Sequence, residues 1–251
     1  MRHRTLLLAL TLLAAPLAAM AQDKRPADER PQRIRGGPDG SIGYAGGSLA
    51  LALPVGDFRN YVSVGGGING FVAMKLARDG AASIRLDGTF LIYGSDTYRT
   101  QLSPTIPQVN VDVTTSNLIF GMAVGPQLMR PSGAVRPYVS GGVGFSYFAT
   151  VSSVSGTHDV EPFAESTNFD DFTLAWRGAA GLLIQVGRGR TPIWLDFSGH
   201  FVRNGMTRYL RPGGIDVDPI TNGLIIDPVE SETAFWLVHA GVTFGIQPRS
   251  R

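Results

Sequence analysis

Near its carboxyl end the chain reads WLVHAGVTFGI over residues 236–246. Large apolar residues alternate in this stretch with small or polar ones. The apolar set is Trp236, Val238, Val242, Phe244 and Ile246, and the other set is His239, Gly241, Thr243 and Gly245. Since successive side chains of a strand point to opposite faces, the pattern predicts a β-strand with one apolar and one polar face.

The same alternation recurs in seven further stretches, so the sequence predicts eight strands in one domain, residues 42–246. The apolar faces of the other seven are Leu49, Leu51 and Leu53; Ile68, Val72, Met74 and Leu76; Ile84, Leu86, Phe90 and Ile92; Leu118, Phe120, Met122, Val124 and Leu128; Val139, Val143, Phe145 and Tyr147; Leu174, Trp176, Leu182 and Ile184; and Ile193, Leu195, Phe197 and Phe201.

The connections between these strands alternate between short and long. Glycine-containing tight turns are predicted at residues 77–80, 131–134 and 187–190. Long polar loops are predicted near residues 55–64, 95–114, 151–171 and 204–232. Short turns at one end and long loops at the other are typical of outer-membrane β-barrels, and both chain ends then lie on the short-turn side.

Residues 1–21 have the features of an export signal: a basic start with Arg2 and Arg4, an apolar run over 5–13, and a cleavage site at 19–21 with the small residues Ala19 and Ala21. The apolar run is shorter than the roughly 20 residues of a spanning helix, so we predict cleavage. The formal net charge of +2 disappears with Arg2 and Arg4. The composition therefore gives no support to nucleic-acid binding.

Residues 22–41 are predicted to form a flexible periplasmic arm, because Pro, Arg, Asp and Gly dominate and almost nothing apolar is available for burial. Residues 247–251 form a short C-terminal tail. Cysteine is absent, which excludes disulfides and thiolate metal sites and suits an oxidising compartment.

Alternation alone does not decide whether the apolar face points outward to lipid or inward to a cavity. A soluble lipocalin-like barrel would surround a ligand with its apolar face. The membrane alternative is favoured, because the predicted strands span about 11–14 residues and can cross a bilayer at a tilt. Aromatic residues near the strand ends also suit the membrane interfaces: Tyr147, Trp176, Trp236 and Phe244.

Residues 239–246 resemble the C-terminal assembly signal of outer-membrane barrels, which is carried here by His239, Gly241, Phe244 and Ile246. Residues 136–145 and 52–58 also resemble segments of small eight-stranded outer-membrane proteins. Over residues 42–246 the chain is thus similar to the family that includes the transmembrane domain of outer membrane protein A. The resemblance implies an all-β, eight-stranded antiparallel up-and-down transmembrane β-barrel. The chain departs from the family pattern by continuing past Ile246 through residues 247–251.

The polar face of the predicted strands carries titratable side chains: Arg85, Asp87, Arg177, Asp196, His200 and His239. The interior of an eight-stranded barrel is just wide enough to be filled by its own side chains, so charges there must pair. We predict a structural interior network. A narrow pore that conducts ions or protons is the alternative.

Residues 200–205 are loosely similar to the His-x-Ser-Asn segment of the lipid A deacylase family, which is also an eight-stranded barrel. That family uses a serine nucleophile two residues after the histidine, with the histidine as base. The corresponding residue here is Val202, which cannot attack an ester. The position of His200 in the strand alternation also places it on the inner face, away from lipid. We therefore expect no catalytic residue, no cofactor and no metal site, and a lipid-modifying enzyme remains only an alternative.

Taken together, these patterns predict a non-enzymatic protein integral to the bacterial outer membrane, with a structural or surface-interaction role and both termini in the periplasm. The expected partners are outer-membrane lipid and the barrel assembly machinery, and nucleic acid is not among them. A surface ligand, an oligomeric state and a role for the acidic residues of the long loops are not specified by the sequence.

Overall fold

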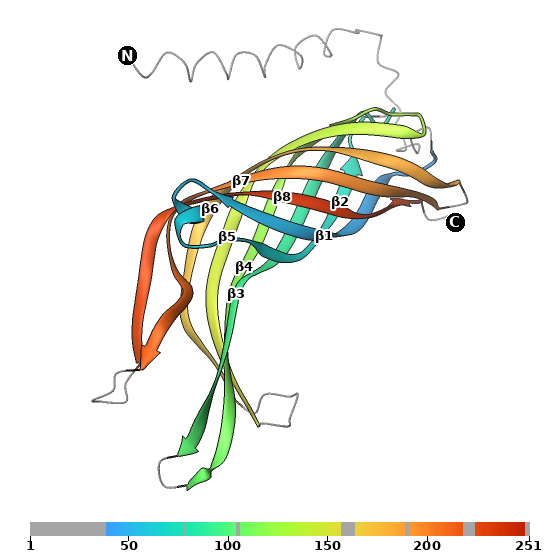
Figure 1. Cartoon of the computed structure of the whole chain (residues 1–251). Coiled ribbons are helices and arrows are strands. Elements are labelled where there is room, and N and C mark those ends of the chain that lie inside the picture. The colour runs from blue at the N-terminus through green and yellow to red at the C-terminus, as the bar shows by residue number, and fades with distance from the viewer. Residues whose placement is uncertain are drawn as a thin grey trace, which may run out of the picture. The chain divides into compact units, whose positions relative to one another are not determined.

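The computed structural model describes residues 39–77, 79–103, 106–156, 164–188, 191–217 and 224–248. Within these ranges eight strands follow one another (Figure 1): β1 (Gly43–Val55), β2 (Gly65–Lys75), β3 (Ala82–Ser103), β4 (Ile106–Met129), β5 (Val135–Gly156), β6 (Ala164–Arg188), β7 (Pro192–Val217) and β8 (Leu224–Ile246). A short 3₁₀ helix, η1 (Gly56–Asn60), connects β1 to β2. The described ranges contain no helix long and apolar enough to cross a membrane.

Each strand pairs antiparallel with the next, and β8 pairs with β1 from Ile246 opposite Gly43 to Ala234 opposite Val55. The sheet is therefore closed, which confirms the predicted eight-stranded up-and-down barrel. The tight turns predicted at 77–80 and 131–134 are confirmed, with Gly80 and Gly133 at φ +79° and +110°. We call the end that carries these turns the turn end, and the opposite end the hairpin end.

Several predicted segments lie outside the described residues. These are the signal peptide (1–21), the arm as far as residue 38, the end of the third tight turn (189–190) and tail residues 249–251. Residues 39–41 were assigned to the arm, but they are described, and Asp39 is only 5% exposed at its side chain. Asp39 thus contacts the barrel from the segment before β1, through hydrogen bonds to Tyr44 and Lys75.

The apolar faces point outward and the polar faces point inward. Leu49 and Leu174 are each 72% exposed on the outer surface, whereas Arg85 and Asp87 are 3% and 5% exposed in the interior. A soluble barrel built around an apolar ligand needs the opposite arrangement. The outward apolar band is instead what a strand crossing lipid requires.

Glycine permits close approach between neighbouring strands on the inner face. A Cβ atom at Gly144 of β5 would overlap the carbonyl oxygen of Met122 in β4, and one at Gly67 of β2 would overlap the carbonyl oxygen of Phe90 in β3. A side chain at either position would force the backbones apart, as is common where a strand bends tightly in a small barrel.

The long polar loops were predicted wrongly. β3 to β8 span 22 to 26 residues each, and most of residues 95–114, 151–171 and 204–232 is strand. Polar composition was taken as a sign of coil, but a strand with water on both faces is also polar. Cross-strand hydroxyl pairs hold these extensions together, such as Thr97 with Thr114 at 2.9 Å and Thr115 with Ser152 at 2.9 Å.

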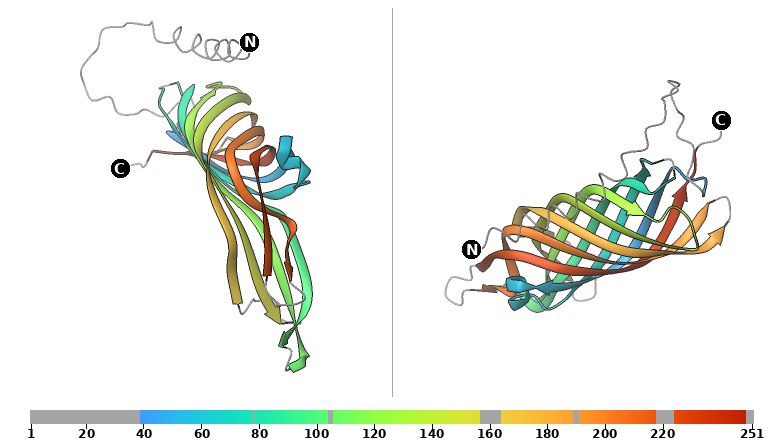
Figure 2. Two further views of the ribbon diagram at one scale, coloured as in Figure 1. Left: turned by 90° about the vertical axis from the view of Figure 1, so that its left-hand side faces the viewer. Right: turned by 90° about the horizontal axis from the view of Figure 1, so that it is seen from above.

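The extensions divide into two parts at the hairpin end (Figure 2). The ladder between β2 and β3 ends at Gly66 opposite Ile92, and the ladder between β6 and β7 ends at Ala175 opposite Asn204. Beyond these pairs, β3 to β6 continue as a four-stranded projecting sheet, and β7 and β8 continue as a separate pair of strands, which we call the projecting hairpin (206–217 with 224–232).

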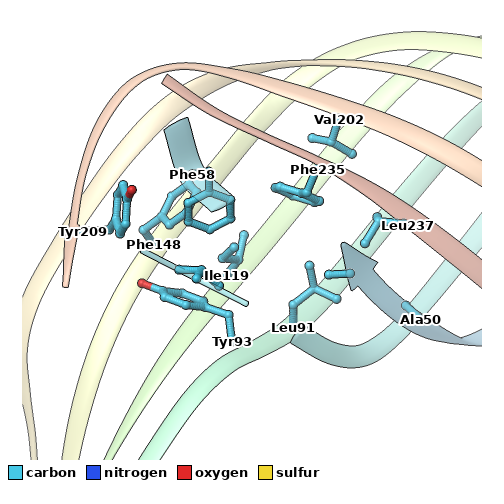
Figure 3. Close-up of a cluster of buried hydrophobic side chains, with 12 residues drawn as sticks. Ala50, Phe58, Leu91, Tyr93, Ile119, Phe148, Val202, Tyr209, Phe235 and Leu237 are labelled. Atoms are coloured by element: carbon cyan, nitrogen blue, oxygen red, sulfur yellow. The ribbon is translucent and has the colours of Figure 1, made fainter. Parts of the chain in front are cut away.

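The connection 55–64 was also predicted as a polar loop, but η1 turns its apolar side into the barrel. Phe58 is 1% exposed, and its ring centroid lies 5.2 Å from that of Tyr209 and 5.9 Å from that of Tyr93 (Figure 3). Phe148 and Phe235 complete its surroundings, at 6.2 and 6.1 Å. We call these five rings the aromatic plug, because they fill the barrel at its hairpin end.

We expect Phe58→Ala to lower the free energy of unfolding by about 3–5 kcal/mol, because it leaves a cavity among the four surrounding rings. Urea unfolding of the purified protein in detergent or lipid vesicles measures the change. Asp57→Ala, on the exposed side of η1, is the matched control and should change the stability by less than about 1 kcal/mol. Equal losses for the two variants would contradict a packed plug.

Candidate functional site

The barrel interior contains a charged group centred on Asp87 of β3. Its carboxylate accepts hydrogen bonds from Arg85, at 3.0 Å from Nε to Oδ2 and 3.0 Å from Nη2 to Oδ1. Arg177 of β6 approaches the same carboxylate at 3.7 Å and donates to Thr89 Oγ1 at 2.7 Å. Arg85 also donates to Gln127 Oε1 at 2.9 Å. One carboxylate is thus shared by two guanidinium groups, and the remaining donors find neutral acceptors.

Asp196 of β7 joins this group through hydroxyls rather than through an ion pair. Its Oδ1 accepts from Tyr138 Oη at 2.9 Å, and its Oδ2 accepts from Thr243 Oγ1 at 3.5 Å. The Tyr138 ring lies 5.5 Å from the Arg85 guanidinium, which connects Asp196 to the charges on β3. Among the described residues, no basic side chain is within ion-pair distance of Asp196.

The rings of the two predicted interior histidines pack against each other. The rings of His200 and His239 have centroids 4.3 Å apart, and the residues are 0% and 3% exposed. Ser198 Oγ lies 3.2 Å from His200 Nε2. Within the described part of the chain, no three His, Asp or Glu residues are grouped so as to hold a metal ion. The structure thus brings all six predicted interior residues onto the inner face, four of them with their charges in one connected group.

Side chains fill the interior at successive levels. The cavity beside Arg85, Asp87 and Arg177 measures about 10 Å³, which is barely enough for one water molecule. The aromatic plug lies toward the hairpin end. Near the turn end a second buried cluster includes Phe71, Met129 and Leu183. These packed layers leave little room for a continuous column of water through the described residues.

A second charged group lies at the turn end, and the sequence did not reveal it. Asp39 accepts from Lys75 Nζ at 2.7 Å, from Arg136 Nη1 at 2.6 Å and from Tyr44 Oη at 2.9 Å. The Arg136 guanidinium also lies 5.1 Å from the Trp194 ring. We call Asp39, Tyr44, Lys75, Arg136 and Trp194 the turn-end cluster.

Asp39 stays ionised in this cluster. Burial by itself would raise the pKa of its carboxyl, but hydrogen bonds from Lys75, Ser41 and Arg136 outweigh burial and hold that pKa well below its usual range. A count of inward charges offers a signal that could have found this site. Lys75 and Arg136 add two cations to an interior whose predicted acids, Asp87 and Asp196, are already matched by two arginines. A further acid was therefore required.

The predicted assembly signal lies on β8, the strand that closes the barrel. His239 and Gly241 face inward, whereas Phe244 is 45% exposed on the outer face and Ile246 forms the last pair with Gly43. A Cβ atom at Gly241 would overlap the carbonyl oxygen of Gly47 in β1. The need for glycine thus has a structural cause here, and recognition by the assembly machinery stays a prediction.

The outer face carries aromatic side chains toward the hairpin end. Trp176 and Trp236 are 66% and 48% exposed, and the rings of Phe145 and Phe172 stack with centroids 5.0 Å apart. Tyr147, which was predicted to belong to the same band, is half-buried. Exposed aromatic side chains of this kind suit a membrane interface.

We expect Asp87→Ala to lower the free energy of unfolding by about 3–5 kcal/mol, because it leaves two buried guanidinium groups without their shared carboxylate. The matched control is Asp227→Ala on the projecting hairpin, where Asp227 pairs with Arg211 at 3.1 Å in an exposed position. Exposed pairs contribute at most about 1 kcal/mol. Urea unfolding in detergent compares the two, and similar losses would mean that the interior is wet.

Comparison with known proteins gives one family match. The model of the outer membrane protein beta-barrel domain matches residues 5–189, which is well over half of the 251 residues. No curated protein matches the chain significantly.

Several solved structures match the chain at low similarity. Neisserial surface protein A has 12% identity and a TM-score of 0.42, over 82% of this chain and 98% of that one. Ail, the attachment invasion locus protein of Yersinia pestis, solved with the heparin analogue sucrose octasulfate, has 11% identity and a TM-score of 0.39, over 80% of this chain and 99% of that one. The N-terminal β-barrel domain of Pseudomonas aeruginosa OprF has 12% identity and a TM-score of 0.33, over 82% and 98%.

The structural likenesses are too distant to carry an argument about function, but the family match rests on the sequence itself. It agrees with the closed barrel, the outward apolar band and the polar interior described above. The chain therefore belongs to the outer membrane protein beta-barrel domain family and is an integral outer-membrane barrel of the Gram-negative type.

Proposed function

We propose that this protein is a non-enzymatic surface-interaction protein, in which a filled barrel anchors the projecting sheet and the projecting hairpin outside the membrane. The observation that carries the proposal is the continuation of β3 to β8 as paired strands well past the last residues that close the barrel. A protein that served only to stiffen the membrane would not need such extensions.

The extensions are built to keep a shape. Hydroxyl pairs link β3 to β4 and β4 to β5, and Asn168 Nδ2 donates to Ser152 Oγ at 2.6 Å between β6 and β5. The backbone N–H of Arg208 in β7 donates to Asp171 Oδ2 at 2.7 Å, which braces the projecting hairpin against β6. Paired strands present fixed polar surfaces, whereas free loops would lose conformational entropy on binding.

The projecting hairpin presents opposite charges on its two strands. Arg203, in β7 just before the hairpin, pairs with Glu232 of β8 at 2.8 Å, and Arg211 pairs with Asp227 within the hairpin at 3.1 Å. All four side chains are about half exposed or more, so these pairs contribute little to stability. They are available instead to partners that offer charge of either sign at the cell surface.

A catalytic role is not part of the proposal. The lipid A deacylase resemblance places His200 and Val202 where that family has its base and nucleophile. Here both side chains point into the barrel, with 0% and 3% of their surface exposed. A lipid substrate outside the barrel would not reach them, and valine has no nucleophilic atom.

The proposal also includes an orientation, with the hairpin end outside the cell, the turn end and both termini in the periplasm, and outer-membrane lipid around the barrel.

Because the chain has no cysteine, single introduced cysteines can be labelled selectively to test this orientation. We expect Thr97→Cys, on the projecting sheet, to react with a membrane-impermeant maleimide on intact cells. Ser132→Cys, in the β4–β5 turn, should react only after the outer membrane is permeabilised. The reverse pattern would contradict the proposed display.

The alternative of a narrow pore predicts a different electrical behaviour. We expect the wild-type protein in planar lipid bilayers to show no steady single-channel conductance, because the plug, the central charges and the turn-end cluster each fill the lumen. Recordings with a porin of known conductance in the same bilayers provide the positive control. A steady, reproducible conductance of the purified protein would favour the pore instead.

A further inference from the structure

The turn-end cluster carries more positive charge than the described residues neutralise. The side chains of Lys75 and Arg136 are 3% and 5% exposed. Among the described residues, Asp39 is the one acidic side chain within ion-pair distance of either cation. Two buried cations thus share a single carboxylate, and such a site favours an anion strongly.

Two hydrogen-bond donors, one in the cluster and one beside Gly40, have no partner among the described residues. Trp194 is 0% exposed, its ring lies against Tyr44 with centroids 5.4 Å apart, and its Nε1–H has no partner among the described residues. Gln247 lies against Gly40, the residue after Asp39, and its Nε2 is likewise without a partner within the described ranges. Indole N–H and amide NH₂ groups only donate, so both are suited to an oxygen acceptor.

The carboxylate of Asp39 uses both of its oxygens in this site. Oδ1 accepts hydrogen bonds from Lys75 Nζ at 2.7 Å and Ser41 Oγ at 2.6 Å. Oδ2 accepts hydrogen bonds from Arg136 Nη1 at 2.6 Å and Tyr44 Oη at 2.9 Å. Short, charge-assisted bonds to both oxygens are the geometry by which a carboxylate is recognised.

The hydrogen-bond donors of this site lie on strands of the barrel, whereas the acceptor, Asp39, does not. Tyr44, Lys75, Arg136 and Trp194 belong to β1, β2, β5 and β7, which the barrel holds in place. Asp39 lies outside the strands, since the β1 ladder begins at Gly43. Gly40 follows Asp39 with φ +74°, so a rotation at this glycine would withdraw the carboxylate without breaking any strand pair.

We propose that Tyr44, Lys75, Arg136 and Trp194 form a carboxylate-binding site at the turn end, with Asp39 as its resident and displaceable ligand. The partner is a molecule that offers a carboxylate, such as an acidic peptide in the compartment that the turn end faces. Binding is a ligand substitution: the incoming carboxylate takes the bonds of Asp39, and the segment that carries Asp39 is released from the barrel. This site is separate from the surface role proposed above.

Acetate is the probe, and Trp194 is the reporter. In the full chain carrying Trp176→Phe and Trp236→Phe, Trp194 is the sole tryptophan. In this background we expect Asp39→Ala to show a saturable change in tryptophan fluorescence and a saturable rise in the unfolding midpoint when sodium acetate is added in detergent at constant ionic strength. With Asp39 present, half-saturation should need at least about tenfold more acetate, because the tethered carboxylate competes at a high effective concentration.

The controls separate a carboxylate site from a general salt effect. Adding Lys75→Met to Asp39→Ala should abolish the saturable response, and sodium chloride should not produce one. If Asp39→Ala folds poorly, its refolding yield replaces the titration, and acetate should restore that yield in a Lys75-dependent manner. The proposal is overturned by a response that is absent, by one that is unchanged without Lys75, or by a yield that acetate does not restore. A response to inorganic phosphate as strong as that to acetate would overturn the carboxylate assignment.

Discussion

The narrow interior of the closed barrel is the constraint on which the rest of the structure depends. The interior of an eight-stranded barrel is just wide enough to be filled by its own side chains, so a buried charge needs a partner inside the protein. Asp87 meets this need with Arg85 and Arg177, and Asp196 meets it with hydroxyl groups. Where no partner for cations is available from the strands, the segment before β1 supplies Asp39. The result is an interior in which these described charges are paired or hydrogen-bonded.

The outer surface changes in polarity along each long strand, because the strand passes from lipid into water. On β4 one parity carries Met122 and Phe120 where the strand crosses the lipid, and continues through Ser116 to Thr114 on the projecting sheet. The backbone pairing is uninterrupted, and only the side chains change from apolar to hydroxyl-bearing. Strand pairing therefore extends beyond the membrane because β-branched and small polar residues pair well in water.

The two ends of the barrel are closed by residues that come from outside the strands. Phe58 reaches the hairpin end from η1, and Asp39 reaches the turn end from the segment before β1. One uses aromatic packing and the other uses charge. This difference matches the two sites, since Tyr93 and Phe148 surround Phe58 while cations surround Asp39. In the proposed site, another carboxylate replaces that of Asp39, whereas the packed ring of Phe58 has no such replacement.

Alternation with a period of two is a local property of each strand, so the sequence predicted eight strands and placed Arg85, Asp87, Arg177, Asp196 and both histidines together on their polar faces. The closed barrel and the inward direction of those faces were predicted from strand length, the aromatic residues near the strand ends and the resemblance to outer-membrane barrels. It did not determine how far the strands extend, because polar residues are equally compatible with a loop and with a strand that has water on both faces. The packing of Phe58 among four other rings at one end, and the pairing of Asp39 with both Lys75 and Arg136 at the other, depend on the tertiary structure. Asp39 and Arg136 are 97 positions apart, and Phe58 and Phe235 are still farther apart in the chain, and nothing in a local pattern specifies which distant side chains will meet.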